Sequence, residues 1–190
     1  INLQILIIWV SSKSPDPNFF NKANRMFDEL EKLSNVEDVL IPKTLQEIID
    51  GISLDKLLLP ISMEGGEAIE NNLNNLYHFI NRGLFYLGPT WNHSLDWVSS
   101  NYDEKFNKTK LRTVGLSNFG KEVINICQEN KVLIDVSHIG EKSFWDIEEI
   151  SKKPFIASHS SVHKLCPHFR NLHDDQIIAI KNKKGLIGIN

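Results

Sequence analysis

Three side chains whose chemistry suits metal binding follow apolar runs of this 190-residue sequence. Glu64 comes directly after one run, while His138 and His159 each follow a run and one serine. Two imidazoles and one carboxylate form a ligand set of catalytic zinc sites, which keep a fourth position for water. A hydrogen-bonded structural role is the alternative for each histidine, and spacing alone leaves both interpretations open. The three runs are Leu57–Met63, Val132–Val136 and Phe155–Ala157.

Strand-like runs alternate with helical stretches along the chain, which predicts a parallel sheet with helices outside it. The strands are nearly continuous apolar runs, as expected when both faces are buried. The predicted strands are Leu3–Val10, Leu57–Met63, Leu84–Leu87, Val132–Val136, Phe155–Ser158 and Leu186–Ile189. The predicted helices are Asp16–Leu33, Thr44–Ile52, Gly66–Arg82, Ser117–Asn130, Ser143–Ser151 and His173–Asn182, and residues 91–110 are predicted to form a long loop.

Six strands fit either a complete doubly wound sheet or part of a (β/α)8 barrel, which typically needs about 250 residues. The polar residues favour the barrel, because its strands end at one mouth and supply catalytic groups there. Glu64, His138 and His159 would then meet. We predict one catalytic domain over residues 1–190, cut at both ends, because the sequence starts and stops on strand-like runs.

Composition excludes several classes of protein. The formal net charge is −3, from 21 basic and 24 acidic residues, so no basic excess exists to bind nucleic acid. No apolar run approaches the roughly 20 residues of a membrane span. Cys127 and Cys166 have no metal-type spacing, and we expect two buried or half-buried thiols. The compartment is not set by the sequence, although a cytoplasmic one is slightly favoured.

Surface roles are the local prediction for the loop after His159. His163, His168 and His173 are expected to be solvated, and nothing local distinguishes Arg170 from an arginine that serves solubility.

Six segments together resemble the membrane (renal) dipeptidase family of zinc metallopeptidases, in the family's order and at its approximate spacing. The resemblance covers nearly the whole chain, most densely residues 115–190. The segments are Ser62–Ile69, Gly115–Gly120, Leu133–His138, Lys153–Ser160, Arg170-Asn171 and Gly185–Asn190.

The resemblance implies a TIM barrel of the metal-dependent hydrolase type with two zinc ions. Glu64 matches the family's bridging glutamate, His138 and His159 match the histidines that complete one metal site, and Arg170 matches a substrate-binding arginine. The implied activity is hydrolysis of the peptide bond of dipeptides by a metal-activated water. The implied partners are dipeptide substrates. A homodimer is a separate expectation, and the sequence alone leaves the oligomeric state open.

Three departures from the family pattern limit what this chain can do. The family's His-x-Asp pair for the second metal is absent, so we expect at most about one zinc per chain. The catalytic acidic group is expected beyond Asn190. Trp91 takes the place of a family histidine, with His93 two residues on, and which of them assumes its role is left open.

Two other functions fit the same residues. One is an amidohydrolase that acts on a small amide or lactone, and the other is a relative that binds without catalysis. Because six of eight barrel strands would leave two unpaired sheet edges, we also expect the isolated chain to be poorly soluble or the true molecule to be longer.

Overall fold

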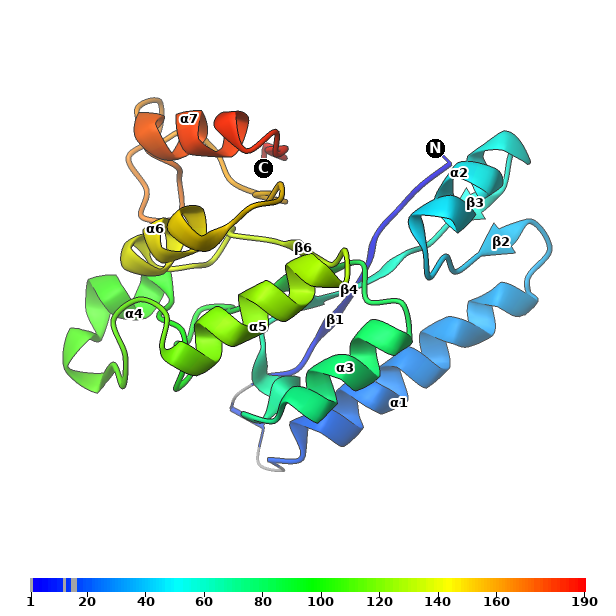
Figure 1. Cartoon of the computed structure of the whole chain (residues 1–190), viewed down its shortest axis with the longest axis horizontal. Helices are drawn as coiled ribbons and strands as arrows, with labels where there is room; N and C mark the ends of the chain where they lie inside the picture. The colour runs from blue at the N-terminus through cyan, green and yellow to red at the C-terminus, as the bar shows by residue number, and fades with distance from the viewer. Residues whose placement is uncertain (1, 12, 15–16) are drawn as a thin grey trace. The chain divides into compact units, whose positions relative to one another are not determined.

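The computed structural model describes residues 2–11, 13–14 and 17–190 of the chain (Figure 1). The chain divides into two compact units, residues 1–86 and residues 87–190. The single domain predicted over residues 1–190 stays a prediction.

The first unit contains two pairs of parallel strands. Strands β1 and β4 pair in parallel, with Trp9 opposite Glu64 at the end of the register. The Phe85 N–H donates to the Ile61 carbonyl (2.8 Å), so the chain before β5 lies beside β4. Strands β2 and β3 form the other parallel pair. The elements of this unit are β1 (Leu6–Trp9), α1 (Phe19–Glu31), η1 (Lys32–Asn35), β2 (Val39–Leu40), α2 (Leu45–Ser53), β3 (Leu57–Leu58), β4 (Ile61–Glu64), η2 (Glu67–Ile69) and α3 (Leu73–Asn81).

Aromatic packing joins the helices of the first unit. Helix α1 buries Ala23 and Phe27 and contacts β1. The Phe27 ring stacks on Phe79 of α3 with 5.3 Å between centroids. Both rings are fully buried, so this contact forms the centre of the unit's core.

Four local features of the first unit differ from the sequence prediction. The strand predicted over Leu57–Met63 is divided into β3 and β4 at Leu59-Pro60, where proline has no N–H for a ladder. The helix predicted over Gly66–Arg82 is divided into η2 and α3, because Glu70 and Asn71 have left-handed φ values of 51° and 53°. Strand β2 was not predicted. The helix predicted from Asp16 begins at Phe19, and Asp16 lies outside the described residues.

The second unit follows the same parallel plan. The Asp135 N–H donates to the Leu87 carbonyl (2.9 Å), the Ile156 N–H to Ile134 (2.8 Å), and the Ala157 N–H to Leu186 (2.9 Å). Each extended segment therefore lies beside the next one along the chain. The elements are β5 (Tyr86–Gly88), which begins at the last residue of the first unit, α4 (Asn101–Phe106), η3 (Lys108–Lys110), α5 (Asn118–Glu129), β6 (Leu133–Ile134), α6 (Glu141–Ile150) and α7 (Asp174–Asn182).

This sequential order favours the barrel over the doubly wound alternative. A doubly wound sheet reverses its strand order at a switch point. Within the described residues of the second unit, the parallel segments follow chain order with no reversal. In the first unit β4 follows β1 directly, and the short β2 is the exception, because β3 lies between β2 and the chain at Leu3.

Two predictions for the second unit were wrong in detail. Residues 91–110 are not wholly a loop, because α4 forms there with the Ser100 hydroxyl accepting from the Asp103 N–H (3.1 Å). The strands predicted over Phe155–Ser158 and Leu186–Ile189 are present only as isolated parallel bridges. Among the described residues, no helix is long and apolar enough to cross a membrane.

Candidate metal centre

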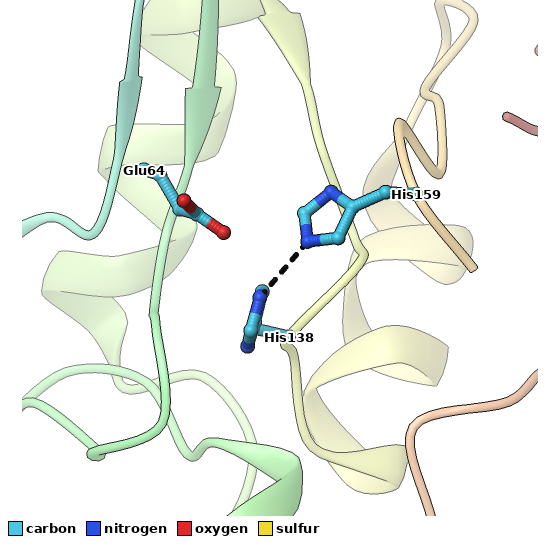
Figure 2. Close-up of side chains that lie close together, drawn as sticks. All are labelled: Glu64, His138 and His159. Carbon is cyan, nitrogen blue, oxygen red and sulfur yellow. Dashed lines mark hydrogen bonds between the residues drawn. The ribbon is translucent and has the colours of Figure 1, made fainter. Parts of the chain in front are cut away.

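His138 and His159 lie at the carboxyl ends of two neighbouring parallel segments. One segment begins with β6 and the other follows α6, and Val136 N–H donates to the Ile156 carbonyl between them (2.8 Å). The two imidazoles meet through their Nε2 atoms at 3.0 Å, as the dashed line in Figure 2 marks. Both side chains are half-buried. The structure thus confirms that these two histidines, 21 residues apart, converge.

The separation of the two nitrogens suits a metal that binds both. Zinc–nitrogen bonds of about 2.0–2.1 Å at a tetrahedral angle place two ligand nitrogens about 3.3 Å apart. The Nε2 atoms of His138 and His159 are 3.0 Å apart, so only a small adjustment would be needed. The donor pair therefore fits a metal ion.

A buried carboxylate supports this pair. Asp135, which is 3% exposed, accepts hydrogen bonds from the backbone and hydroxyl groups of both Ser137 and Ser158. The Ser158 hydroxyl also contacts Nδ1 of His159 (2.7 Å). The Ser137 hydroxyl accepts from the His159 N–H (3.1 Å). Asp135 is therefore linked to His159 through the two serines.

Glu64 belongs to the first unit, where it is the last residue of β4 and is half-buried. Gly65 follows it with a φ of +100°, a backbone conformation that side chains rarely adopt. Figure 2 draws Glu64 with the two histidines of the second unit. Its place in one site with them stays a prediction.

A second acid, Glu67, lies three residues after Glu64 and is 7% exposed. Burial raises the pKa of its carboxyl to about 7; a backbone hydrogen bond opposes this rise, and the charge of Glu64 adds to it. Its Oε2 atom has no hydrogen-bond partner among the described residues. Sequence analysis did not single out Glu67.

The family is established by comparison with known proteins. A model of the membrane dipeptidase family, peptidase family M19, matches residues 2–190. The chain belongs to the membrane dipeptidase family. The resemblance found in the sequence is confirmed, and this is a family of metallopeptidases.

Two curated members show how much of the family protein is present. An uncharacterized protein in the PQQ-III 3' region of Acinetobacter calcoaceticus is 38% identical over 154 residues, which are 81% of this chain and 49% of that protein. Human dipeptidase 3 is 28% identical over 179 residues, which are 94% of this chain and 36% of that protein. The chain therefore spans half or less of the length of these two relatives.

Solved structures establish the fold. A metallopeptidase from Rhodobacter sphaeroides, liganded with a phosphinate mimic of the dipeptide L-Ala-D-Ala, matches with a TM-score of 0.84 at 24% identity, over 98% of this chain and 60% of that one. An amidohydrolase from Pseudomonas aeruginosa matches with a TM-score of 0.85 at 20% identity, over 100% of this chain and 55% of that one. The predicted mixed α/β fold of TIM-barrel type is confirmed, and these fractions are consistent with a partial barrel.

The remaining predicted site residue of this membrane dipeptidase family member is Arg170. Its side chain is half-buried and its Nη1 atom is buried, unlike a solvated surface arginine. Its neighbours Phe169 and Asn171 line a cavity of about 400 Å³ within the second unit. Substrate binding by Arg170 stays a prediction.

The loop histidines are more exposed than Arg170. His168 and His173 are exposed, as expected, while His163 is half-buried and stacks on His173 with 4.1 Å between ring centroids.

Trp91 and His93 occupy different surroundings. The Trp91 ring lies 6.2 Å from the His138 ring, centroid to centroid. His93 instead places Nδ1 3.7 Å from the Asp103 carboxylate. Of the two residues between which the sequence left the choice open, Trp91 is therefore the one beside His138.

Sequence reasoning also missed Asp135, Ser137 and Ser158 as supporting residues. The available signal was a serine directly before each histidine and an aspartate three residues before His138. Only the pairing of the two segments shows that one carboxylate serves both serines.

Proposed function

We propose that the protein to which this chain belongs is a zinc-dependent dipeptidase that hydrolyses the peptide bond of dipeptides. The observation that carries the proposal is the facing pair of imidazole nitrogens of His138 and His159 in a member of a metallopeptidase family. The relatives support the substrate class, since one is named a dipeptidase and another was solved with a dipeptide mimic.

Glu64, His138 and His159 are proposed to hold the zinc. They offer one carboxylate oxygen and two imidazole nitrogens, a ligand set of catalytic zinc sites. Glu64 is the last residue of β4, and His138 and His159 follow bridged parallel segments, so all three lie at carboxyl ends, where active-site groups gather in barrels. A bound metal would polarise the scissile carbonyl and activate water. A second zinc, for which this chain lacks a His-x-Asp pair, completes the proposal for the whole protein.

Arg170 is proposed to bind the substrate. A guanidinium presents a planar set of donors that suits the carboxylate of an unblocked dipeptide. Partial burial of the side chain supports this role, because a charge removed from water binds an anion more strongly.

Activity of the whole protein is tested by comparing an unblocked dipeptide with its N-acetylated form and with a small lactone. The protein should hydrolyse an unblocked dipeptide far faster than its N-acetylated form or a small lactone, and a phosphinate dipeptide mimic should inhibit it. Faster turnover of the lactone would support the other amidohydrolase reaction instead. Binding of the mimic without turnover would identify a non-catalytic relative.

Metal content separates ligand assignment from catalysis. Elemental analysis of the purified 190-residue chain should find at most about one zinc per molecule, because one site has its full ligand set. The double variant His138→Ala, His159→Ala should lose it, and the exposed His168→Ala is the matched control. Two tightly held ions, or undiminished zinc in the double variant, would contradict the assignment. The predicted homodimer is tested by sedimentation of the whole protein.

A further inference from the structure

We propose that Asp135 is a positioning residue that fixes the tautomer of His159 through Ser158, so that His159 presents an unprotonated Nε2. That this nitrogen serves a metal rests on the proposed function. The tautomer itself follows from hydrogen bonds within the second unit.

Asp135 accepts at both of its oxygens. Its Oδ1 accepts from the Ser137 N–H (3.1 Å), the Ser137 hydroxyl (2.6 Å) and the Ser158 N–H (2.8 Å). Its Oδ2 accepts from the Ser158 hydroxyl at 2.5 Å. Because an ionised carboxylate only accepts, the protons of both hydroxyls are committed to Asp135.

The commitment of the Ser158 proton decides the state of His159. A serine hydroxyl has one proton, and that of Ser158 points to Asp135. At its 2.7 Å contact with His159 Nδ1, the Ser158 oxygen must therefore accept. Nδ1 carries the proton, and Nε2 of the neutral ring keeps its lone pair.

The assignment also fixes the direction of the contact between the two histidines. Since Nε2 of His159 is the acceptor, Nε2 of His138 donates across the 3.0 Å contact. His159 is thus ready to bind a metal, whereas His138 must first give up its Nε2 proton. A second hydrogen bond, from the backbone N–H of His159 to the Ser137 hydroxyl, fixes the main chain that carries the ring.

The variant Asp135→Asn should reverse the direction of the hydrogen bonds that link residue 135, Ser158 and His159, because asparagine has the same shape as aspartate but can donate. The amide oxygen must occupy the Oδ1 position, because three donors converge there. The amide nitrogen then faces Ser158 and donates to its hydroxyl, which is freed to donate to His159 Nδ1. The ring proton moves to Nε2, where it blocks a metal.

The first measurement needs no variant. Nitrogen-15 NMR of the metal-free chain, above the pH at which the ring is protonated, should show His159 with its proton on Nδ1. The signal is assigned by its loss in His159→Ala. Asp135→Asn should move the proton to Nε2, and Ser158→Ala should give a mixture. A wild-type His159 protonated on Nε2 would overturn the proposal even if Asp135→Asn does not fold.

The second measurement is zinc affinity by titration with a competing chelator. Asp135→Asn should weaken zinc binding by about 10–100-fold, the usual effect of losing a ligand's supporting group. Asp146→Asn is the matched control, because Asp146 is also a buried aspartate but bonds to the Leu116 N–H and Lys142. Its tautomer signal and zinc affinity should match the wild type.

The outcomes distinguish this inference from the proposed function. Equal losses of affinity in Asp135→Asn and Asp146→Asn would mean that Asp135 acts only through general stability, which would overturn the proposal. Wild-type protein with the expected tautomer but no zinc binding would overturn the proposed function instead.

Discussion

Ionisation of Glu67 opposes folding, because its carboxyl has a raised pKa in the folded chain. Glu67 is 7% exposed, and its burial raises the pKa of its carboxyl. The negative charge of Glu64 raises this pKa further. An acid with a raised pKa in the folded state is neutral in both states at low pH. At higher pH the carboxyl ionises in the unfolded chain while it stays protonated in the folded chain, and this lowers the free energy of unfolding.

The variant Glu67→Gln should therefore become more stable relative to the wild type as pH rises. In the metal-free chain, the difference in free energy of unfolding should grow between pH 4.5 and about 7, from the ordinary pKa to the raised one. It should reach about 3 kcal/mol, at 1.36 kcal/mol per pKa unit, and then level off. Urea unfolding at several pH values measures this difference. Glu29→Gln, at a side chain 71% exposed, is the control and should show no such trend. A flat difference would show that Glu67 ionises in the folded chain as it does in the unfolded one.

The two cysteines should differ sharply in reactivity. Burial raises the pKa of the Cys127 thiol to about 12, whereas Cys166 is exposed, contrary to the expectation of two covered thiols. Because the thiolate is the reactive form, a thiol reagent should label one cysteine in the folded chain and two after denaturation. Mass mapping identifies the site. Rapid labelling of Cys127 in the folded chain would mean that helix α5 opens readily.

Among the elements, α1 and α3 are linked by the guanidinium of Arg82 in addition to their aromatic packing. Arg82, at the end of α3, bonds to Glu31 (2.7 Å), Asp28 (2.8 Å) and Asn24 of α1 (2.6 Å). It also lies over the Phe27 ring at 4.9 Å. Only 15% of its side chain is exposed, so these contacts are partly shielded from water.

Arg82→Lys should therefore lower the free energy of unfolding by roughly 1–3 kcal/mol, because an ammonium cannot reproduce the planar set of bonds to charged partners. Denaturant unfolding measures the loss. Lys32→Met is the control, since its pair with Glu29 is exposed on both sides and should contribute little. Equal stability of Arg82→Lys and the wild type would show that the planar set of bonds from Arg82 does not stabilise the packing of α1 on α3.

Elements with local signals were predictable from the sequence. Helix α5 begins directly after Ser117, the first residue of the predicted helix, whose hydroxyl accepts from the Gly120 N–H, and the helix period shows in its buried Val123 and Cys127. The break at Glu70 depends on a left-handed turn that neither residue type demands. Helix α4 is short and has a weak apolar period. A serine at position 100, in an aromatic and polar stretch, was therefore not enough to predict the helix that it caps.

The site was predictable to the same extent. Strand-end position was enough to predict that His138 and His159 converge, because parallel segments carry their following residues to the same edge, but it left open whether they bind a metal. Asp135 was not predictable in this way, since its role depends on which segment lies beside it. The pairing of Asp135 with Ile156 is a tertiary fact that no local pattern contains.

At the scale of the whole molecule, metal binding should appear as stability. A ligand that binds only the folded state raises the free energy of unfolding, by about 2.7 kcal/mol at a free concentration 100 times its dissociation constant. Zinc at that level should stabilise the chain by this amount, and a chelator should reverse the effect. Calorimetry measures it, with the His138→Ala, His159→Ala variant as the control. An equal gain in that variant would place the ion elsewhere.

Gly188 lies where the chain leaves no room for a side chain. Its N–H donates to the Ala157 carbonyl (2.8 Å) and its own carbonyl accepts from the Ser160 N–H (2.8 Å), so it holds the chain on both sides of His159. A Cβ atom there would lie 2.0 Å from the backbone carbonyl oxygen of Ser158. Even alanine would push Ser158 away from its partners, although Gly188 has no functional group of its own. A mutational scan for inactive variants should therefore recover this glycine together with the histidines, whereas a search for reactive side chains would pass over it.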